Sequence, residues 1–455
     1  MSSEREVGGR EWFNDLIEEV GVVFIHYPVS GSYPYLPFGA KLARALQGEL
    51  ERRLEESGHE PIIFPSLIPL SLFRKEVDFF EGFSPEALVA EKTLSGRELG
   101  EPLILRPTSE VPIYFVFSQL IHSWRDLPKK VYQTVTVYRV ETSATAPLFR
   151  LREVTLFNEE HVFTKGPEEA EALFKEAVRL YSEYLEWARI PHLVVETPPW
   201  DLFPGASRNV DLITFMPDGK ILELASVINF RDKFAKAFEI RYMGEDGVNR
   251  FVHQITYGIG IDRVLGAHLW LHSDERGLTL HPDIAPTDAV VIPIFKEETK
   301  EEVMRYVEEN VVPALRSAGL SFIVDTSEKT PGNKYYYWEK RGVPYRVEVG
   351  AREAREGSVT LFSRAERKRR KVSLEELEEA LGVVRAAYLE AMWERAREKV
   401  LDSMRKNAKL LDIEFEEGAC LEAEEDTGLN TIGKVIGGPL ATEDMVGKVL
   451  FGKKY

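Results

Sequence analysis

The chain has 455 residues, of which 44% are hydrophobic, and a formal net charge of −17. This length predicts two or three domains, and the hydrophobic content excludes an intrinsically disordered protein. Residues 1–10 are polar and lack a signal-peptide core, and no apolar run approaches the roughly 20 residues of a membrane helix. Cys420 is the only cysteine, which excludes an intrachain disulfide. We therefore expect a cytoplasmic enzyme without membrane association.

The first part of the chain predicts a sheet with helices around it. Leucines at positions 42, 46, 50 and 54 recur every four residues and predict a helix over 39–57, which Gly58 ends. An extended apolar segment over 61–69 follows. Further along, the pattern predicts strands over 103–106, 131–140, 221–229 and 253–259, and helices over 167–189 and 264–272. Because strands and helices do not alternate regularly, we expect a mostly antiparallel sheet.

The pattern changes after the proline-containing segment 282–288, which predicts a linker. Strands over 289–294, 320–324, 345–349 and 359–362, with helices over 297–318 and from 374 onward, predict a small α/β domain. The last forty or so residues, which include Gly418, Gly428, Gly433, Gly437 and Gly438, predict a compact tail module. The predicted fold class is α+β, with domains over 1–285, 286–385 and 386–455.

A dense group of charges lies between apolar strand residues in the first domain. Arg139, Glu141, Arg150 and Arg152 come from two predicted strand segments joined by a loop. An arginine fork suits a phosphate group, so the cluster indicates a phosphate site. A surface ladder of cross-strand ion pairs is the alternative. The spacing by itself leaves both interpretations open.

Two other stretches have two interpretations each. Residues 258–263 join a predicted strand to a helix, but they lack the third glycine of a dinucleotide-binding loop. Close backbone packing at the glycines, with Arg263 at the helix start, fits better, and that arginine is either solvated or bound to an anion. The basic run over 364–371 is either a nucleic acid-binding patch or a solvated segment.

Several stretches, in this order along the chain, resemble the signature of class II aminoacyl-tRNA synthetases, and in detail the prolyl-tRNA synthetase family of the archaeal and eukaryotic type. Residues 36–39, with the following helix and residues 64–65, resemble motif 1, the dimer element. Residues 106–110 (Arg-Pro-Thr-Ser-Glu) resemble the amino acid-binding loop. Residues 139–161 resemble motif 2, and residues 257–263 resemble motif 3.

The resemblance spans nearly the whole chain. Residues 203–206 and 217–219 match the family in the first domain, and the terminal Lys-Lys-Tyr matches its last residues. Lys334, Arg346 and residues 338–339, 342–344 and 348–350 resemble its anticodon-binding domain. Each piece is weakly specific alone, but the ordered combination is highly specific.

The resemblance implies a catalytic mechanism. ATP would bind with Arg139 on the α-phosphate and Arg263 on the γ-phosphate, and Mg²⁺ would bridge the phosphates without a metal site of protein ligands. The amino acid carboxylate would attack the α-phosphorus, and the acyl group would pass to tRNA. The implied ATP-binding residues are Arg139, Glu141, Arg150, Arg152, Glu223, Ser226 and Arg263. The implied amino acid-binding residues are Thr108, Glu110, Arg139, Phe157, Glu159 and Ile228. For Phe157, a core aromatic is the alternative.

The chain also departs from the family pattern. Glu223, Ser226 and Ile228 stand where the family usually has glutamine, threonine and histidine. Ile228 removes a polar wall of the pocket, and Glu223 places an anion near ATP where the family has a neutral hydrogen-bond partner, and specificity depends on such polar groups. The loop over 142–147 carries no cation where the family usually has several, which predicts a weaker hold on tRNA. The tail module lacks the cysteines of zinc-bearing relatives, so we expect no zinc.

These observations favour a homodimeric prolyl-tRNA synthetase that uses ATP and Mg²⁺ and has tRNA and proline as partners. One alternative is a paralogue that activates another amino acid or uses another acceptor, which the altered pocket and loop favour. The other alternative is a non-catalytic tRNA-binding or regulatory protein. The presence of Arg139, Glu141, Arg150 and Arg263 argues against it.

Overall fold

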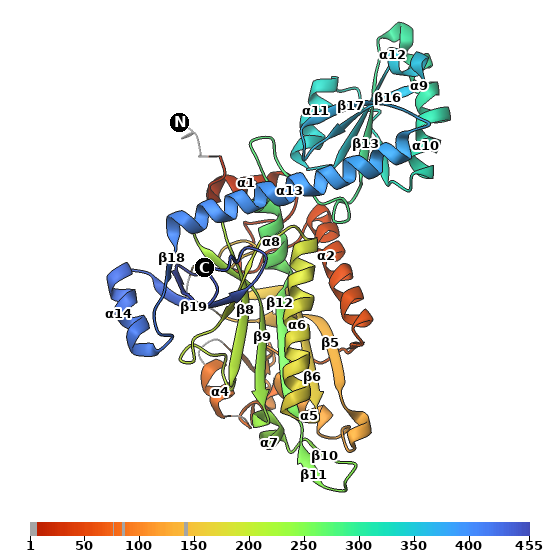
Figure 1. The fold of residues 1–455 in the computed structure, drawn as a ribbon. Helices are drawn as coiled ribbons and strands as arrows, with labels where there is room; N and C mark the ends of the chain where they lie inside the picture. Colours follow the sequence, from red (N-terminus) through yellow and green to blue (C-terminus); the bar gives the residue numbers. More distant parts are fainter. Residues whose placement is uncertain (1–6, 76, 84–86, 141–143) are drawn as a thin grey trace.

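The computed structural model describes residues 7–75, 77–83, 87–140 and 144–455. Its largest element is a ten-stranded sheet with the strand order β1-β5-β6-β12-β9-β8-β7-β19-β20-β18 (Figure 1). The strands are β1 (Glu60–Pro61), β5 (Lys129–Tyr138), β6 (Glu153–Thr164), β7 (Leu193–Glu196), β8 (Arg208–Phe215), β9 (Ile221–Arg231), β12 (His253–Gly260), β18 (Lys409–Leu411), β19 (Asn430–Gly437) and β20 (Val449–Gly452). Only β1 and β5 pair in parallel among the described strands of this sheet, which confirms the predicted antiparallel arrangement.

Helices cover one face of this sheet. These are α1 (Arg10–Glu19), α2 (Pro37–Glu56), α6 (Pro167–Trp187) and α8 (Ile261–Leu271). The four leucines that predicted α2 are fully buried in the core that it shares with α6 and α8. Gly58 has φ +87°, as expected of the residue that ends the helix. Gly39 packs closely against the Val22 backbone. A Cβ at this position would lie 2.1 Å from the Val22 carbonyl oxygen, so a larger residue would not fit.

Smaller elements cover the other face and leave the functional cleft between them and the sheet. They are the three-stranded sheet of β2 (Leu67–Pro69), β3 (Leu88–Lys92) and β4 (Glu98–Leu105), the hairpin of β10 (Arg241–Met243) and β11 (Asn249–Phe251), and the helices α3 (Leu70–Phe73), α4 (Val77–Phe83), α5 (Glu110–Phe117) and α7 (Lys233–Phe238). Aromatic and aliphatic side chains from these elements form a second core.

The second domain is a five-stranded sheet with the order β14-β13-β15-β16-β17. It contains β13 (Ala289–Ile294), β14 (Phe322–Val324), β15 (Tyr345–Gly350), β16 (Ser358–Ser363) and β17 (Lys368–Ser373), with α9 (Lys300–Tyr306), α10 (Val312–Ser317), α11 (Pro331–Lys340) and α12 (Ala351–Glu356). The predicted helix over 297–318 is thus interrupted, since a π-helical turn separates α9 from α10. The sheet has its own hydrophobic core, as expected of a separate domain.

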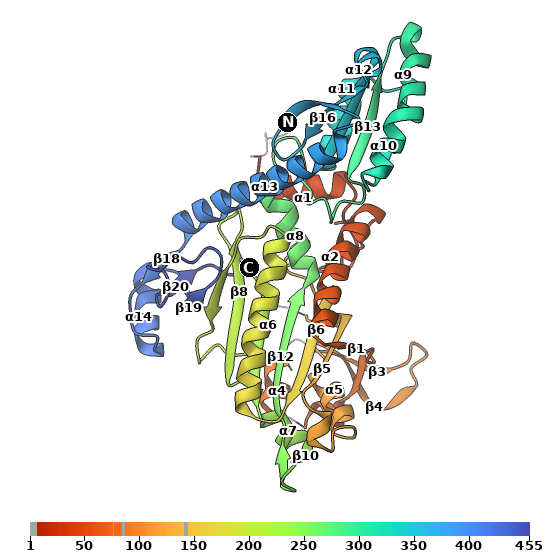
Figure 2. The same cartoon turned by 45° about the vertical axis from the view of Figure 1, so that its right-hand side comes forward.

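The 31-residue helix α13 (Leu377–Asn407) connects the two domains (Figures 1 and 2). Tyr388 and Met392 belong to the core of the second domain, whereas Ala396 and Val400 belong to that of the first. The expected boundary at 385/386 therefore falls within a continuous helix. No glycine or proline lies between Met392 and Ala396, where the apolar face of the helix passes from one core to the other.

The tail module is joined to the first domain rather than standing apart. β19 pairs with β7, so β19, β20 and β18 extend the large sheet, and α14 (Glu417–Thr427) packs beside them. A separate compact module was expected from the glycines, but the pairing between β7 and β19 joins segments far apart in the sequence. Within the described ranges, no helix is both long and apolar enough to cross a membrane.

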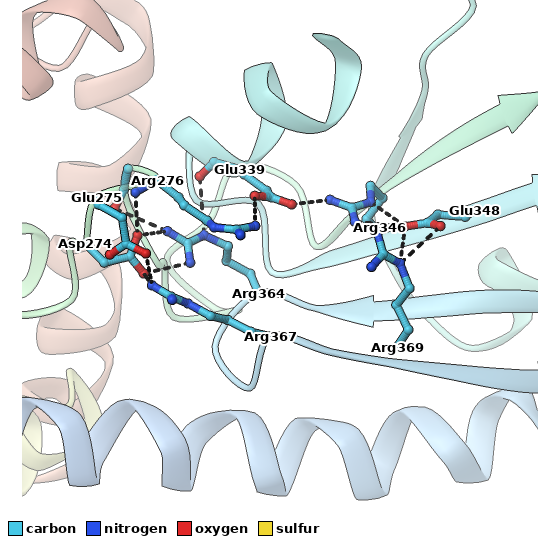
Figure 3. A network of polar contacts seen from close by, with 10 residues as sticks. Asp274, Glu275, Arg276, Glu339, Arg346, Glu348, Arg364, Arg367 and Arg369 are labelled. Carbon is cyan, nitrogen blue, oxygen red and sulfur yellow. Dashed lines mark hydrogen bonds and ion pairs between the residues drawn. The ribbon is translucent and has the colours of Figure 1, made fainter. Parts of the chain in front are cut away.

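A network of ion pairs links the first domain to the second (Figure 3). Arg364, whose side chain is 1% exposed, donates two hydrogen bonds to Asp274, at 2.9 and 2.6 Å. Burial alone would raise the pKa of Asp274, but the contacts with Arg364 outweigh it and hold the pKa well below its usual range. Arg276 of the first domain and Arg346 of the second bind the two oxygens of Glu339.

This network includes arginines of the basic run over 364–371. Arg367 pairs with Asp274, Arg369 with Glu348 and Arg370 with Glu366, at 2.8, 3.2 and 2.6 Å. Half of the residues in the run are exposed, as the solvated interpretation expected, and these arginines pair with acidic side chains of the same chain. Nucleic acid binding by the run stays a prediction.

We predict that Arg364→Met lowers the free energy of unfolding by about 3–5 kcal/mol, because it leaves Asp274 partly buried beside one fewer cation. The double variant Arg364→Met/Asp274→Leu should recover part of that loss, as measured by urea denaturation. As a control, Arg352→Ala removes an exposed pair with Glu356 and should cost less than about 1 kcal/mol. A loss for Arg364→Met no larger than for Arg352→Ala would contradict the prediction.

Candidate active site

A cavity of about 100 Å³ lies over the β6, β9 and β12 strands of the large sheet. Its walls hold charged, polar and aromatic side chains from four stretches that match the family, which lie within residues 106–110, 139–161, 203–206 and 257–263. The lining residues are Thr108, Glu110, Arg139, Val154, Phe157, Glu159, Phe203, Glu223, Leu224, Ser226, Ile228, Thr256, Tyr257, Gly258, Gly260 and Arg263.

The alternation of β6 separates two neighbouring glutamates. Glu159 lies on the cavity side, whereas Glu160 accepts a hydrogen bond of 2.5 Å from the Tyr181 hydroxyl of α6 on the opposite face. Successive side chains of a strand point to opposite faces, so only one glutamate of this pair can line the site.

Two buried carboxylates and a threonine form one end of the cavity. The Thr108 hydroxyl lies 2.6 Å from Glu110 Oε2 and 3.2 Å from Glu159 Oε2. Glu159 also accepts hydrogen bonds from the Ser109 amide at 3.2 Å and from the Gln133 side chain at 2.8 Å. This end is therefore an acceptor-rich subsite suited to an ammonium group.

The two carboxylates differ in ionisation. Burial alone would raise the pKa of Glu159, but His161, whose Nε2 lies 3.9 Å away, and the hydrogen bonds from Ser109 and Gln133 lower it to about 2. Burial, together with the charge of Glu159, raises the pKa of Glu110. Glu159 is thus ionised at neutral pH, and it gives this end of the cavity a negative charge.

Arg139 contacts both the stretch over 106–110 and the stretch over 139–161 to which it belongs. Its Nε donates a hydrogen bond of 2.9 Å to the Pro107 carbonyl. Its guanidinium carbon lies 5.3 Å from the centre of the Phe157 ring. A Cβ at Gly258 would lie 2.7 Å from Phe157 Cζ, so glycine leaves room for this ring. Phe157 is therefore a wall of the cavity and a support for Arg139, not only a core aromatic.

The opposite end of the cavity contains Arg263 at the start of α8. Its Nη1 donates a hydrogen bond of 2.9 Å to the Glu223 carbonyl oxygen and lies 3.7 Å from the Glu223 carboxylate. Both side chains are partly exposed, at 33% and 44%. A cation that solvent can reach at a helix start is available to an anionic ligand.

Ser226 is hydrogen-bonded to Asp211, a residue that the sequence did not predict to belong to the site. Its hydroxyl lies 2.5 Å from Asp211 Oδ1, and Asp211 also accepts a hydrogen bond of 2.7 Å from Thr197. Burial and then the charge of Glu223 raise the pKa of Asp211 to about 7. The register of β8 and β9, which sets Asp211 opposite Ser226, is the signal that could have found it.

Ile228 belongs both to the cavity wall and to the second core, with 5% of its surface exposed. Its side chain offers no hydrogen bond to a ligand. The cavity near Ile228 and Phe203 is accordingly apolar, which suits an aliphatic ligand.

Two sequence-predicted site residues are not among the described residues that line the cavity, and a third lies outside the described residues. The two are Arg150 and Arg152. Arg150 instead contacts the backbone oxygen of Tyr455. The Tyr455 hydroxyl donates a hydrogen bond of 2.7 Å to Asp218. Glu141 lies outside the described residues. The ATP-binding roles of these three residues stay predictions.

Arg106 has a structural position. It is 5% exposed, and its guanidinium donates to the Phe64 and Thr136 carbonyl oxygens at 2.8 and 3.0 Å. It thereby ties the segment after α2 to β5 and supports the Thr108 turn.

Known proteins resemble this chain over both of its domains. The family model of the class II tRNA synthetase core domain (G, H, P, S and T) matches residues 92–271, and that of the anticodon binding domain matches residues 288–382. The proline–tRNA ligase of Methanopyrus kandleri is 38% identical over 95% of this chain and 91% of its own length. That of Ignicoccus hospitalis is 37% identical over 97% and 94%.

Solved structures show the same fold. The Giardia lamblia prolyl-tRNA synthetase in complex with prolyl-adenylate superposes with a TM-score of 0.89 at 27% identity, covering 98% of each chain. The Cryptosporidium parvum enzyme, complexed with halofuginone and AMPPNP, has a TM-score of 0.88 at 24% identity, covering 98% of this chain and 97% of that one. With a class II core, an anticodon-binding domain and relatives of this identity along nearly its whole length, the chain belongs to the prolyl-tRNA synthetase family.

Proposed function

We propose that this protein activates proline with ATP to form prolyl-adenylate and transfers the prolyl group to tRNA. The observation that carries this is the cavity in which Arg139 and Arg263 stand at separate points beside the buried acceptors Thr108, Glu110 and Glu159. One enclosed space thus offers cations for a triphosphate and anions for an amino group.

The amino acid would bind at the acidic end. A secondary ammonium has two N–H donors, and Thr108 and Glu110 would accept from them while the ionised Glu159 balances the charge. Phe157 and Ile228 would enclose the pyrrolidine ring. The carboxylate would then point toward Arg139, where the α-phosphate is expected.

ATP would lie between the two arginines. With Arg139 on the α-phosphate and Arg263 on the γ-phosphate, the proline carboxylate oxygen attacks the α-phosphorus, and the bond to the bridging oxygen breaks to release pyrophosphate. No protein nucleophile takes part. Positioning of the two substrates and stabilisation of the charge that develops on the phosphates supply the rate.

Mg²⁺ belongs to this proposal as an ion held chiefly by ATP. Magnesium usually retains several waters and binds one or two carboxylates together with substrate phosphates. Glu223, the partly exposed carboxylate beside Arg263, fits that role. When bound, the ion would neutralise charge on the phosphates.

The anticodon-binding domain supports tRNA as the acceptor. Ser226 and Glu223 would hold ATP from the β9 side. The apolar side chain at Ile228 favours a second candidate, a paralogue of the same chemistry with another amino acid, and the first test below separates the two. The cytoplasm, as expected from the sequence, is the proposed compartment.

The proposal includes a homodimer formed through the small sheet. Exposed apolar side chains gather on and near it, with Ile63 96% and Leu94 108% exposed, and β3 and β4 project from the body (Figure 2). A second copy of this chain is the proposed partner, because this side adjoins residues 64–65 of the motif 1-like element.

We predict proline-dependent ATP–pyrophosphate exchange by the purified chain when all twenty amino acids are compared with an assay lacking amino acid. Proline alone should support exchange above background. Exchange with a different amino acid would favour the altered paralogue. No exchange with any of them, together with retained tRNA binding, would favour a non-catalytic protein.

We predict that Arg139→Ala lowers proline-dependent exchange by more than about 100-fold, since it removes the cation on the α-phosphate. Its thermal unfolding midpoint should stay within a few degrees of the original. The matched control is Arg52→Ala, an exposed arginine on α2, which should leave exchange unchanged. Unchanged exchange in Arg139→Ala would refute the ATP assignment.

We predict that light scattering gives twice the mass of one chain, and that Ile63→Glu gives the mass of a single chain, because a buried carboxylate at the interface is costly. Val383→Glu, at an apolar residue 66% exposed on α13, serves as the control and should remain dimeric. A single-chain mass for the unmodified protein, or a dimer of Ile63→Glu, would contradict this interface.

A further inference from the structure

A buried carboxylate lies where β12 turns into α8. The β6–β12 ladder reaches its last pair at Gly260 and Phe157, and helix α8 begins at the next residue, Ile261. The backbone N–H of Leu156, one residue past that pair on β6, donates a hydrogen bond of 3.0 Å to Asp262 Oδ2. The Asp262 side chain thus supplies an acceptor to β6 where the partner strand has left the sheet.

The second oxygen of the same carboxylate binds a third segment. The Tyr35 hydroxyl, from the chain just before α2, donates a hydrogen bond of 2.6 Å to Asp262 Oδ1. Asp262 is 1% exposed, and both Tyr35 and Leu156 pack against the main core. One buried side chain therefore joins the segment before α2, strand β6 and helix α8.

Asp262 and Leu156 each precede, in the sequence, a residue that lines the cavity. Arg263 follows Asp262, and Phe157 follows Leu156, while Arg139 lies over the Phe157 ring at 5.3 Å. The Asp262–Leu156 bond therefore links the start of the helix that carries Arg263 to the strand that carries Phe157. Asp262 itself and Tyr35 are not among the described residues that line it.

Burial of this carboxylate is unfavourable for the stability of the fold. Burial raises the pKa of Asp262, against the hydrogen bonds from Tyr35 and Leu156. An apolar side chain could fill this part of the core without desolvating an ion. What an apolar side chain cannot do is accept hydrogen bonds from two separate segments and so hold the start of α8 at a set distance from β6.

We propose that Asp262, held by Tyr35, is a positioning residue for Arg263, and that the pair keeps Arg263 and Arg139 at the separation that a bound triphosphate requires. The inference rests on the proposed use of ATP. Asp262 touches no substrate in this proposal; it acts through the helix start that carries Arg263. Small displacements of a binding group far from the reacting atoms are known to cost large factors in rate.

The test compares two tyrosine-to-phenylalanine variants. Tyr35→Phe removes the hydroxyl bonded to Asp262, and Tyr184→Phe removes a hydroxyl bonded to the Leu46 carbonyl at 3.0 Å, in the core between α6 and α2. The two variants lose one hydrogen bond each and should lower the thermal midpoint by similar amounts. Only Tyr35→Phe should alter the nucleotide site.

We expect Tyr35→Phe to lower kcat/KM for ATP in proline-dependent exchange by about 10-fold, with KM for proline within about twofold of the original. Tyr184→Phe should leave both unchanged. Asp262→Asn, which keeps the size of the side chain but places an amide donor against Tyr35 or Leu156, should lower kcat/KM for ATP further. Equal kinetics in Tyr35→Phe and Tyr184→Phe, or an equal loss toward ATP and proline, would overturn the proposal.

A direct affinity measurement separates this inference from the proposed function. Calorimetric titration of each variant with ATP and Mg²⁺ requires no exchange activity. If the unmodified protein shows no exchange with any amino acid, the proposed function fails, and a weaker ATP Kd in Tyr35→Phe than in Tyr184→Phe still supports the positioning role. An unchanged ATP Kd in Tyr35→Phe refutes it.

Discussion

Strand β6 pairs with β5 on one side and with β12 on the other, and the candidate site depends on this double pairing. β5 leads into Arg139, β6 carries Phe157 and Glu159, and β12 ends beside Arg263. Side chains alternate along a strand, so the register decides which of them share a face. A slip of one residue in β6 would exchange Glu159 for Glu160 in the cavity and turn Phe157 away from Arg139.

The charges of the site follow from burial as much as from residue type. Glu159 and Glu110 are both buried glutamates, yet the hydrogen bonds and His161 near Glu159 lower its pKa while burial raises that of Glu110. Placing two ionised carboxylates side by side in a closed space is unfavourable. The surroundings of Glu159 favour its ionisation, whereas burial of Glu110 opposes ionisation, and the charge of Glu159 is one that an ammonium group can balance.

The two domains are held by contacts of different kinds. The apolar face of α13 belongs to both cores and joins the domains through contacts that have no preferred direction. The bidentate pair between Arg364 and Asp274 adds directional contacts, and Glu339 binds one arginine from each domain. Buried ion pairs contribute little net stability compared with apolar packing, but they discriminate between orientations. The same reasoning applies at smaller scale to Asp262, whose two oxygens bind separate segments.

Much of this protein can be read from its sequence. The i+4 leucines of α2, the β-branched run of β5 and the change of pattern after residue 288 are local signals, and local signals determine helices and strands. The ordered motifs identified the family, and with it Thr108, Glu110, Arg139, Phe157, Glu159 and Arg263 as neighbours. The tertiary structure alone decided the pairing of β19 with β7, the passage of α13 between two cores, the internal pairing of the basic run and the positions of Asp211 and Asp262. These features depend on which distant segments meet, and neither residue type nor spacing along the chain determines a contact whose free energy comes from burial and from partners far away in the sequence.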